Sequence, residues 1–317
     1  MPPRVSIIVP CFNGARYIPG LARSLAPVLA CGEAPCEVIV VDDGSTDDSA
    51  DLICQHLPAA QLIRQFNRGV SAARNAGVAV ACGEYLQLLD VDDTIEPAKL
   101  ATQAAAADQA RADVAYSDWR LLTINGENIR TEVFAPALAP GEMVESLLTG
   151  WYVPPVGYLF RRSSYLELGG CDETIKVWED FDLFLRFALA DRPHVYAPGI
   201  LANYHRYLAV RSLGRSDPRI SGRSRERILR ASIATLARQG RLTGPRRRAA
   251  ARAFFAVLRT ANIPEPGWLR GMAATIRELD PAFRPPGNLN YRTVAALLGL
   301  AAAERVAVAG RNWLHPR

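Results

Sequence analysis

Apolar and polar positions alternate in regular blocks over the first hundred residues. Four short apolar runs are typical of buried strands: "RVSIIVP", "CEVIVVDD", "QLIRQ" and "EYLQLLD". Between and after them, apolar residues recur at helical spacing, which predicts helices over 15–29, 45–57, 70–83 and 96–111. Local signals mark their ends: Ser45 with Asp48 is a capping box, Gly83 closes the third helix, and Pro97 lies in the first turn of the fourth. Strands that alternate with helices predict an α/β fold with a mostly parallel sheet covered on both faces.

The carboxyl ends of these four strands carry the candidate chemistry. In open sheets of this kind, ligands bind beyond the strand ends, and all four ends here are polar: 10–13, 42–43, 67–69 and 90–93. Neither a G-x-G-x-x-G fingerprint nor a G-x-x-x-x-G-K-[ST] phosphate loop follows the first strand. Because two of the ends are acidic pairs, we expect an anionic ligand to be held through a bound cation.

The fourth strand ends in three crowded carboxylates, Asp90, Asp92 and Asp93. Side chains of an extended chain alternate with period two, so Asp90 and Asp92 project to the same side. They could share one hard divalent cation, which prefers carboxylate and phosphate oxygens. A lone D-x-D more often just begins a solvated loop, but the other polar strand ends favour a site.

Composition describes a globular chain with no membrane span. Its 317 residues are 49% apolar and 22% charged, enough for one large or two ordinary domains. No apolar run is long enough to cross a bilayer, and the N-terminus has no secretion-signal pattern, so we expect a cytoplasmic protein. The six cysteines form no C-x-x-C pair, which favours free, mostly buried thiols over a zinc site or a disulfide framework.

Charge divides the chain into two regions. Residues 1–207 hold 16 basic and 26 acidic side chains, a balance of −10, whereas residues 208–317 hold 21 and 6, a balance of +15. Together they give the net charge of +5. We therefore predict a domain over 1–207 and a basic helical region over 208–317.

Six stretches over about 4–207 resemble glycosyltransferase family 2, the inverting enzymes of the GT-A fold. They are "VSIIVPCFNGARYI", "VIVVDDGSTDDS", "NRGVSAARNAG", "GEYLQLLDVDD", "FRRSSYLELGGCDE" and "WEDFDLFLRFALA". Each is weak alone, but all six in this order are specific. The resemblance implies transfer of a sugar from a nucleotide-diphospho-sugar to a hydroxyl of a glycan or lipid-linked acceptor, with Mn²⁺ or Mg²⁺ as cofactor. It further implies a place in bacterial cell-surface polysaccharide or glycoconjugate assembly.

The resemblance also implies roles for individual residues. Asp92 would bind the metal, with Asp90 and His205 as further ligands. The region around His205 reads "NYHRYLAVRS", in which the family's usual "Y-R-x-H"-like order is changed, so an ordinary loop histidine is an open alternative. The implied donor-binding residues are Pro10, Asn13, Asp42, Asp43, Gly69, Arg74, Asn75, Asp90, Asp93 and Arg206.

A second acidic group opens the predicted helix in "WEDFDLFLRFALA". Inversion needs a base that takes the proton of the attacking hydroxyl, and the resemblance implies this role for Asp180, beside Glu179. Negative charge at a helix N-terminus is favoured by the helix dipole, so both carboxylates also have a purely structural interpretation. Trp178 and Trp151 are candidates for stacking on the acceptor, or for core packing.

Sugar and acceptor specificity is expected in the segment 113–165, where "DVAYSDWRLLTINGENIRTEVF" predicts a hairpin turning at Asn125–Gly126. Two alternatives stay open: a GT-A module that binds a nucleotide-sugar or glycan without turnover, and a phosphatase-like hydrolase suggested by "VIVVDDGSTD". The hydrolase family needs its motif at the first strand and a downstream lysine, and the chain's only lysines, Lys99 and Lys176, do not suit that role.

The basic region contains two amphipathic helices. "SGRSRERILRASIATLARQG" and "GPRRRAAARAFFAVLRTAN" place apolar stripes among arginines. Such helices lie on anionic membrane surfaces or pack their stripes onto a neighbouring domain. We expect peripheral attachment at the cytoplasmic face of the membrane. Nucleic-acid binding is not expected, because aromatic residues are not interleaved with these arginines.

Overall fold

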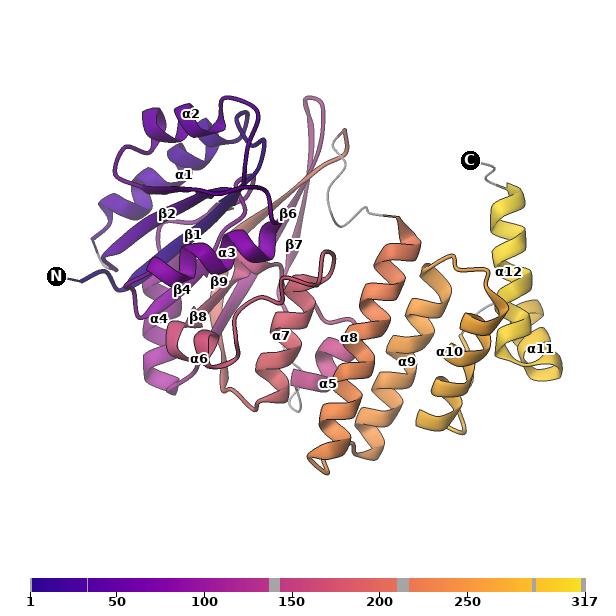
Figure 1. The fold of residues 1–317 in the computed structure, drawn as a ribbon. Coiled ribbons are helices and arrows are strands. Elements are labelled where there is room, and N and C mark those ends of the chain that lie inside the picture. The colour runs from indigo at the N-terminus through magenta and orange to yellow at the C-terminus, as the bar shows by residue number, and fades with distance from the viewer. Residues whose placement is uncertain (1, 33, 137–142, 210–216, 287–288, 315–317) are drawn as a thin grey trace. The chain divides into compact units, whose positions relative to one another are not determined.

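The computed structural model describes residues 2–32, 34–136, 143–209, 217–286 and 289–314 (Figure 1). They form two compact units, one of residues 1–137 with 152–210 and the other of residues 138–151 with 211–317. The division expected after residue 207 therefore does not account for residues 138–151, which belong to the second unit. Helix α5 (Met143–Leu148) belongs to the second unit, where it packs against α9 (Gly244–Thr260).

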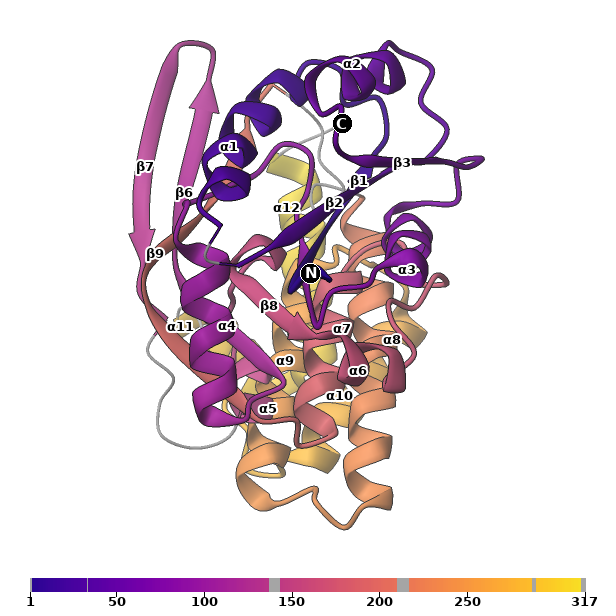
Figure 2. The same ribbon diagram turned by 90° about the vertical axis from the view of Figure 1, so that its left-hand side faces the viewer.

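The first unit is built on a nine-stranded sheet (Figure 2). The strand order is β3-β2-β1-β4-β8-β6-β9-β5, and β7 pairs with β6. The strands are β1 (Val5–Cys11), β2 (Cys36–Asp42), β3 (Gln61–Arg64), β4 (Tyr85–Leu88), β5 (Thr94–Ile95), β6 (Val114–Asn125), β7 (Asn128–Phe134), β8 (Tyr158–Arg161) and β9 (His194–Tyr207).

Half of the sheet is parallel, as the sequence predicts, and half is mixed. β1 pairs in parallel with β2 and β4, and β2 with β3. β8 then runs antiparallel to both β4 and β6, β9 is parallel to β6, and β5 is antiparallel to β9. The four predicted strands thus form the parallel half, and every antiparallel pairing involves a strand that the block pattern does not predict, either β5 or one after residue 111.

Helices cover both faces of this sheet (Figure 2). α3 faces β1 and β2, where a Cβ on Gly77 would lie 2.6 Å from Ile8, and α7 packs its Phe184 on Tyr158 of β8. α4 lies on the opposite face with α1, and its Lys99 reaches the Tyr158 carbonyl at 3.1 Å. The helices of this unit are α1 (Ile18–Ala30), α2 (Ser49–His56), α3 (Val70–Val80), α4 (Lys99–Ala110), α6 (Arg162–Glu167) and α7 (Glu179–Leu189), with the 3₁₀ turn η1 (Pro155–Gly157).

Three predicted helix ends are wrong. The capping box at Ser45 does not form, because α2 begins at Ser49 and the Ser45 hydroxyl accepts the Asn13 N–H at 3.0 Å. Gly83 is not a helix cap: α3 ends at Val80, and a Cβ at Gly83 would lie 2.6 Å from the Ser6 nitrogen. Pro97 precedes α4 instead of lying in its first turn. Tertiary contacts thus replace the local caps at Ser45 and Gly83, and just before Pro97 the Glu96 N–H is bonded to the Leu201 carbonyl of β9 at 2.9 Å.

The predicted hairpin is confirmed. β6 and β7 are antiparallel, Asn125 pairs with Asn128, and Gly126 between them has φ of 60°. The cysteines are free, but only Cys11 and Cys171 are buried, so the expectation of mostly buried thiols is wrong.

The second unit is helical. Besides α5 and α9 it contains α8 (Pro218–Arg238), α10 (Pro266–Leu279), α11 (Leu289–Leu298) and α12 (Leu300–Leu314). α9 packs between α8 and α10, and the expected apolar stripes are inside: Leu236, Phe254 and Leu258 are fully buried. These stripes therefore pack against one another and are not available to a membrane. Within the described residues, no helix is both long and apolar enough to cross a bilayer.

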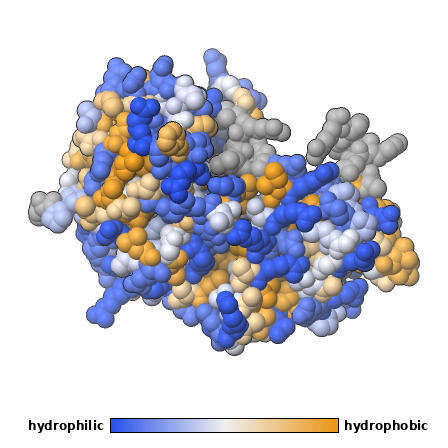
Figure 3. Space-filling model, in the orientation of Figure 1, coloured by the Kyte–Doolittle hydropathy of each residue, from blue (hydrophilic) through white to orange (hydrophobic). Residues whose placement is uncertain are grey.

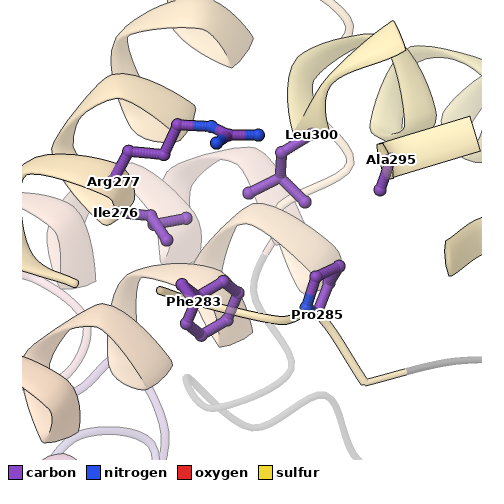
Figure 4. A pocket seen from close by; sticks show the side chains of 6 residues that line it. All are labelled: Ile276, Arg277, Phe283, Pro285, Ala295 and Leu300. Carbon is purple, nitrogen blue, oxygen red and sulfur yellow. The ribbon is translucent and has the colours of Figure 1, made fainter. Parts of the chain in front are cut away.

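Apolar surface and one small pocket mark the end of this unit. Leu297, Leu298 and Val306 are exposed, and Figure 3 shows apolar side chains at the surface near α11. A pocket of about 20 Å³, room for one water molecule, lies among side chains of α10, α11, α12 and the segment after α10 (Figure 4). It is lined by Ile276, Arg277, Phe283, Pro285, Ala295 and Leu300. Its size and lining exclude it as a nucleotide-sugar site.

Candidate active site

The carboxyl ends of three parallel strands meet at one edge of the first unit's sheet. β2, β1 and β4 are adjacent, and the backbone continues their pairing past the strand ends. The Asp43 N–H donates to the Cys11 carbonyl at 2.8 Å, and the Leu89 N–H to the Ile8 carbonyl at 3.0 Å. Pro10 is buried inside β1. The structure thus brings three of the four predicted polar strand ends together.

Asp43 organises the loop between β3 and α3. Its Oδ1 accepts the Gln65 side chain at 2.6 Å and the Arg68 N–H at 2.9 Å, while Oδ2 accepts the Gly69 N–H at 2.8 Å. Gly69 has φ of 94°, a conformation that favours glycine. The fourth strand end is therefore tied to the other three by this carboxylate.

Asp42 and Asn13 hold the neighbouring turns. Asp42 accepts the Ser45 N–H at 2.9 Å and the Arg64 guanidinium at 3.1 Å. The Asn13 side-chain oxygen accepts the Thr46 N–H at 2.8 Å. Both predicted donor-binding residues thus have structural partners that shape the rim of the site.

Arg74 is a buried bridge between two acidic segments. Its guanidinium is 2% exposed and lies 2.7 Å from Asp90 and 3.3 Å from Glu179. Burial alone would lower the pKa of Arg74, but the two carboxylates raise it well above its usual value. Arg74 therefore does not line an open pocket: it fixes the loop after β4 against the start of α7.

Asn75 acts in the same way on the segment before α7. Its side-chain amide donates to the Cys171 carbonyl and accepts the Cys171 N–H, both at 2.9 Å, and it reaches Glu173 at 3.2 Å. With its polar atoms engaged in this manner, Asn75 positions the loop that leads to the candidate base.

The "DVDD" turn holds partly buried carboxylates. The Asp93 N–H donates to the Asp90 carbonyl at 3.0 Å, which closes the turn. Burial and the charge of Asp90 raise the pKa of Asp92 to about 6, and burial with the charges of Asp92 and Asp90 raises the pKa of Asp93 well above its usual value. This crowding destabilises the ionised form of these carboxylates.

Asp93 and His205 leave polar atoms unpaired beside this turn. Asp93 Oδ1 accepts the His205 N–H at 2.8 Å, whereas its buried Oδ2 finds no partner within the described part of the chain. The His205 Nδ1, 3.9 Å from Asp93 Oδ1, is buried and also lacks one there, and burial lowers its pKa. Arg206 follows His205 on β9 and is exposed.

The candidate base lies in the first turn of α7. Asp180 Oδ1 accepts the Phe181 N–H at 2.7 Å, and Oδ2 accepts the Tyr152 hydroxyl at 3.3 Å. Burial raises the pKa of Asp180, and burial with the charge of Asp180 raises that of Glu179 to about 7. Asp180 is thus a more basic carboxylate than one in water, held by a backbone donor and a side-chain donor.

The two candidate tryptophans are placed differently. Trp178 precedes α7 with φ of 72°, and its ring meets Phe181 edge-on at 6.1 Å. Trp151 belongs to the second unit. Neither geometry identifies an acceptor contact.

Sequence reasoning missed several residues at this edge. Arg16, after β1, packs over the Tyr17 ring at 4.4 Å, and its charge lowers the pKa of Asp92. Phe12 is half-exposed beside Asn13. Tyr152 reaches the base from outside every quoted motif. These aromatic and basic residues can be read from the sequence. Only the fold shows that Arg16 lies close enough to act on Asp92 and that Tyr152 contacts Asp180.

Among the described residues, no group of three or more His, Cys, Asp or Glu side chains is placed to hold an ion. The unpaired Asp93 oxygen and the closely spaced Asp92 carboxylate nevertheless fit a cation site. A diphosphate would have to supply the remaining ligands.

Comparisons with known proteins agree with this geometry. The family model "Glycosyl transferase family 2" matches residues 6–168. An uncharacterized glycosyltransferase of Nostoc sp. is 34% identical over 188 residues, 56% of this chain and 57% of that protein. The succinoglycan biosynthesis protein ExoO of Rhizobium meliloti is 31% identical over 202 residues, 59% of this chain and 56% of that protein. The matches thus span little more than half the length of these relatives.

The fold extends the likeness over nearly the whole chain. The crystal structure of residues 1–349 of TarS from S. aureus has a TM-score of 0.68 at 18% identity and covers 99% of this chain and 93% of that one. The same fragment in complex with UDP-GlcNAc gives a TM-score of 0.67. The sheet is that of a GT-A glycosyltransferase, and the chain belongs to glycosyl transferase family 2.

Proposed function

We propose that the protein transfers a sugar, with inversion, from a nucleotide-diphospho-sugar to an acceptor hydroxyl. The observation that carries this proposal is the Arg74 bridge, which joins the "DVDD" turn to the helix that holds Asp180. A donor-side acidic turn and a candidate base are thereby fixed to each other within one unit. The TarS fragment solved with UDP-GlcNAc supports a nucleotide-sugar as donor.

Inversion follows from a base on the side opposite the leaving group. Asp180 accepts the proton of the acceptor hydroxyl while its oxygen attacks the anomeric carbon and the diphosphate leaves. The raised pKa of Asp180 increases its proton affinity, and its two hydrogen bonds fix its orientation. Asp43 and Arg74 keep the surrounding loops in place.

A divalent cation, Mn²⁺ or Mg²⁺, would be held by Asp92 with Asp90, and His205 and the unpaired oxygen of Asp93 lie beside them. When bound, it supplies positive charge for the diphosphate. Asp92→Asn should weaken metal-dependent nucleotide binding far more than Asp93→Asn, because Asp93 is already engaged by the His205 N–H. Calorimetry with and without metal tests this, and equal nucleotide affinity in both conditions for the wild type removes the metal from the mechanism.

The base is tested by Asp180→Asn. Nucleotide affinity should stay near the wild-type value, while transfer falls by about 10²–10⁴-fold. Asp182→Asn is the matched control, because Asp182 lies in the same helical turn but pairs with Arg186 at 2.8 Å. If Asp180→Asn transfers sugar at a rate near that of the wild type, Asp180 is not the base and only stabilises the start of the helix.

The acceptor is a glycan or lipid-linked molecule of cell-surface polysaccharide or glycoconjugate assembly. The name of ExoO, which refers to succinoglycan biosynthesis, supports this class of pathway. Such acceptors place the enzyme at the inner face of the membrane, and the basic region 208–317 supplies positive charge for peripheral attachment there. Because its apolar stripes are buried, this attachment is electrostatic.

Attachment is tested by sedimentation with vesicles that contain anionic lipid. Replacing Arg247, Arg248 and Arg252, which are exposed on α9, by Gln should remove about 1 kcal/mol of binding free energy each. A control that replaces the exposed Arg23, Arg111 and Arg130 of the first unit removes equal charge and should have a smaller effect. Binding that is insensitive to salt would contradict an electrostatic contact.

A further inference from the structure

An aromatic cluster adjoins the candidate base. Tyr152 donates its hydroxyl to Asp180, and its ring meets Trp119 of β6 edge-on, with centroids 6.3 Å apart and planes at 87°. Tyr204 of β9 meets Trp119 in a similar way, at 6.2 Å and 73°. We call Tyr152, Trp119 and Tyr204 the aromatic cluster. Its members come from three separate parts of the first unit.

Trp119 is the fixed centre of the aromatic cluster. Its ring stacks on Phe134 of β7 at 4.4 Å and 10°, and only 5% of the residue is exposed. Its indole N–H is buried, and no acceptor for it exists among the residues that the structure describes. A buried donor without a partner is unfavourable, and such groups in native proteins call for an explanation.

Tyr152 contacts the candidate base and is also accessible to a ligand. In contrast to Trp119, 37% of Tyr152 is exposed, although its hydroxyl contacts the base. The aromatic cluster therefore combines a buried centre, Trp119, with a partly exposed ring that contacts the base.

This combination suits a sugar ring. A saccharide has apolar C–H faces and a rim of hydroxyls, and a tyrosine has an apolar ring with a polar tip. An aromatic wall with a few fixed polar groups is the usual construction of a small-molecule site. An apolar lipid tail would offer no acceptor to the buried indole N–H of Trp119.

We propose that the aromatic cluster is the acceptor subsite, that it takes a saccharide ring, and that Tyr152 positions the Asp180 carboxylate toward a hydroxyl of that ring. The inference rests on the proposed function and names its acceptor class. In the reaction, the acceptor O–H bond breaks and its proton goes to Asp180. The freed electron pair forms the bond to the anomeric carbon, and the bond from that carbon to the diphosphate breaks with its electrons on the diphosphate oxygen. The Tyr152 O–H bond stays intact.

The pH dependence separates positioning from packing. The Tyr152 hydrogen bond lowers the pKa of Asp180 against the larger effect of burial, so its removal should raise that pKa. The acidic limb of the rate profile should then move to higher pH, because the base must be ionised. The other ionisable groups that act on Asp180, or on which it acts, are Arg74, Asp90, Glu179, Tyr158 and Tyr204.

The experiment measures nucleotide release from a panel of nucleotide-sugars, alone and with p-nitrophenyl glycosides or the linear polyols glycerol and ribitol. Tyr152→Phe keeps the ring, and Tyr152→Leu removes it. Tyr196→Phe is the matched control: Tyr196 is also 37% exposed and donates its hydroxyl to an aspartate, Asp118, at 2.6 Å. Nucleotide affinity by calorimetry reports on the integrity of the donor site in every variant.

We expect a glycoside to accelerate release by the wild type. Tyr152→Phe should lower kcat about tenfold with an unchanged KM for the glycoside and a shifted acidic limb, as the loss of one hydrogen bond to a charged group predicts. Tyr152→Leu should in addition raise the KM for the glycoside, and Tyr196→Phe should change neither.

Two results would overturn the inference: acceleration by linear polyols but by no glycoside, or a wild-type KM for the glycoside in Tyr152→Leu. Absence of nucleotide release by the wild type from every donor, with and without acceptor, would instead contradict the proposed function.

Discussion

The two units of the chain treat buried charge differently. In the first unit, Asp42, Asp43 and Asp93 are buried at the strand ends, Arg74 is buried in α3, and Asp93 keeps one oxygen unpaired among the described residues. In the described part of the second unit, Glu304 is buried against Arg259 at 2.7 Å, within an interior of Leu, Ile, Phe and Ala. Buried charge lowers stability unless it is fully paired.

This difference in buried charge indicates that the first unit contains destabilising carboxylates at the candidate active site. The raised pKa values of Asp92, Asp93, Asp180 and Glu179 all come first from burial, the first two after β4 and the other two in the first turn of α7. Clustered perturbed carboxylates of this kind are typical of functional sites. The second unit is stabilised mainly by the apolar packing of its helices.

Breaking the buried bridge should have the largest effect on stability. Arg74→Met leaves Asp90 and Glu179 without their cation and should lower the free energy of unfolding by about 3–5 kcal/mol. The matched change in the second unit, Arg223→Met, breaks an exposed pair with Glu265 and should cost less than about 1 kcal/mol. Urea denaturation measures both free energies of unfolding. Equal decreases in the two variants would contradict the difference between the units.

A cavity in the second unit should have the next largest effect. Leu236 of α8 is fully buried, so Leu236→Ala should lower the free energy of unfolding by about 2–5 kcal/mol. Leu297→Ala, at a leucine that is 76% exposed, should change it by less than about 0.5 kcal/mol. If Leu236→Ala were as mild as Leu297→Ala, apolar packing would not be what stabilises this unit.

The smallest predicted effect is a pH dependence of the first unit. The pKa of Glu179 rises from 4.5 to about 7 on folding, so the folded state holds this proton more tightly than the unfolded state. Its contribution to stability is therefore lost as pH increases from about 4.5 through about 7. Glu179→Gln, a neutral mimic, should gain stability relative to the wild type over this window in urea titrations at several pH values. A difference that stays constant with pH would contradict the raised pKa.

Much of the first unit's fold is predictable from sequence because its signals are local. The apolar runs correspond to β1, β2, β3 and β4, and Asn125–Gly126 correctly predicts the β6–β7 hairpin. The acidic strand ends likewise locate the candidate site. The boundary errors at Ser45, Gly83 and Pro97 arise because contacts with segments distant in sequence replace the local caps.

Only the tertiary structure decided which side chains meet. Periodicity and charge in the sequence determined the α/β alternation, the acidic strand ends and the basic amphipathic helices. They could not show that Arg74 is a buried bridge, that α5 joins the second unit, or that Tyr152 contacts Asp180. The physical reason is separation along the chain: Arg74 and Glu179 are 105 residues apart, so no local pattern records their pairing.

The apolar stripes of α8 and α9 are equally ambiguous in sequence, because a membrane and a neighbouring helix bury the same side chains by the same hydrophobic effect. The fold resolves the ambiguity by packing these helices together.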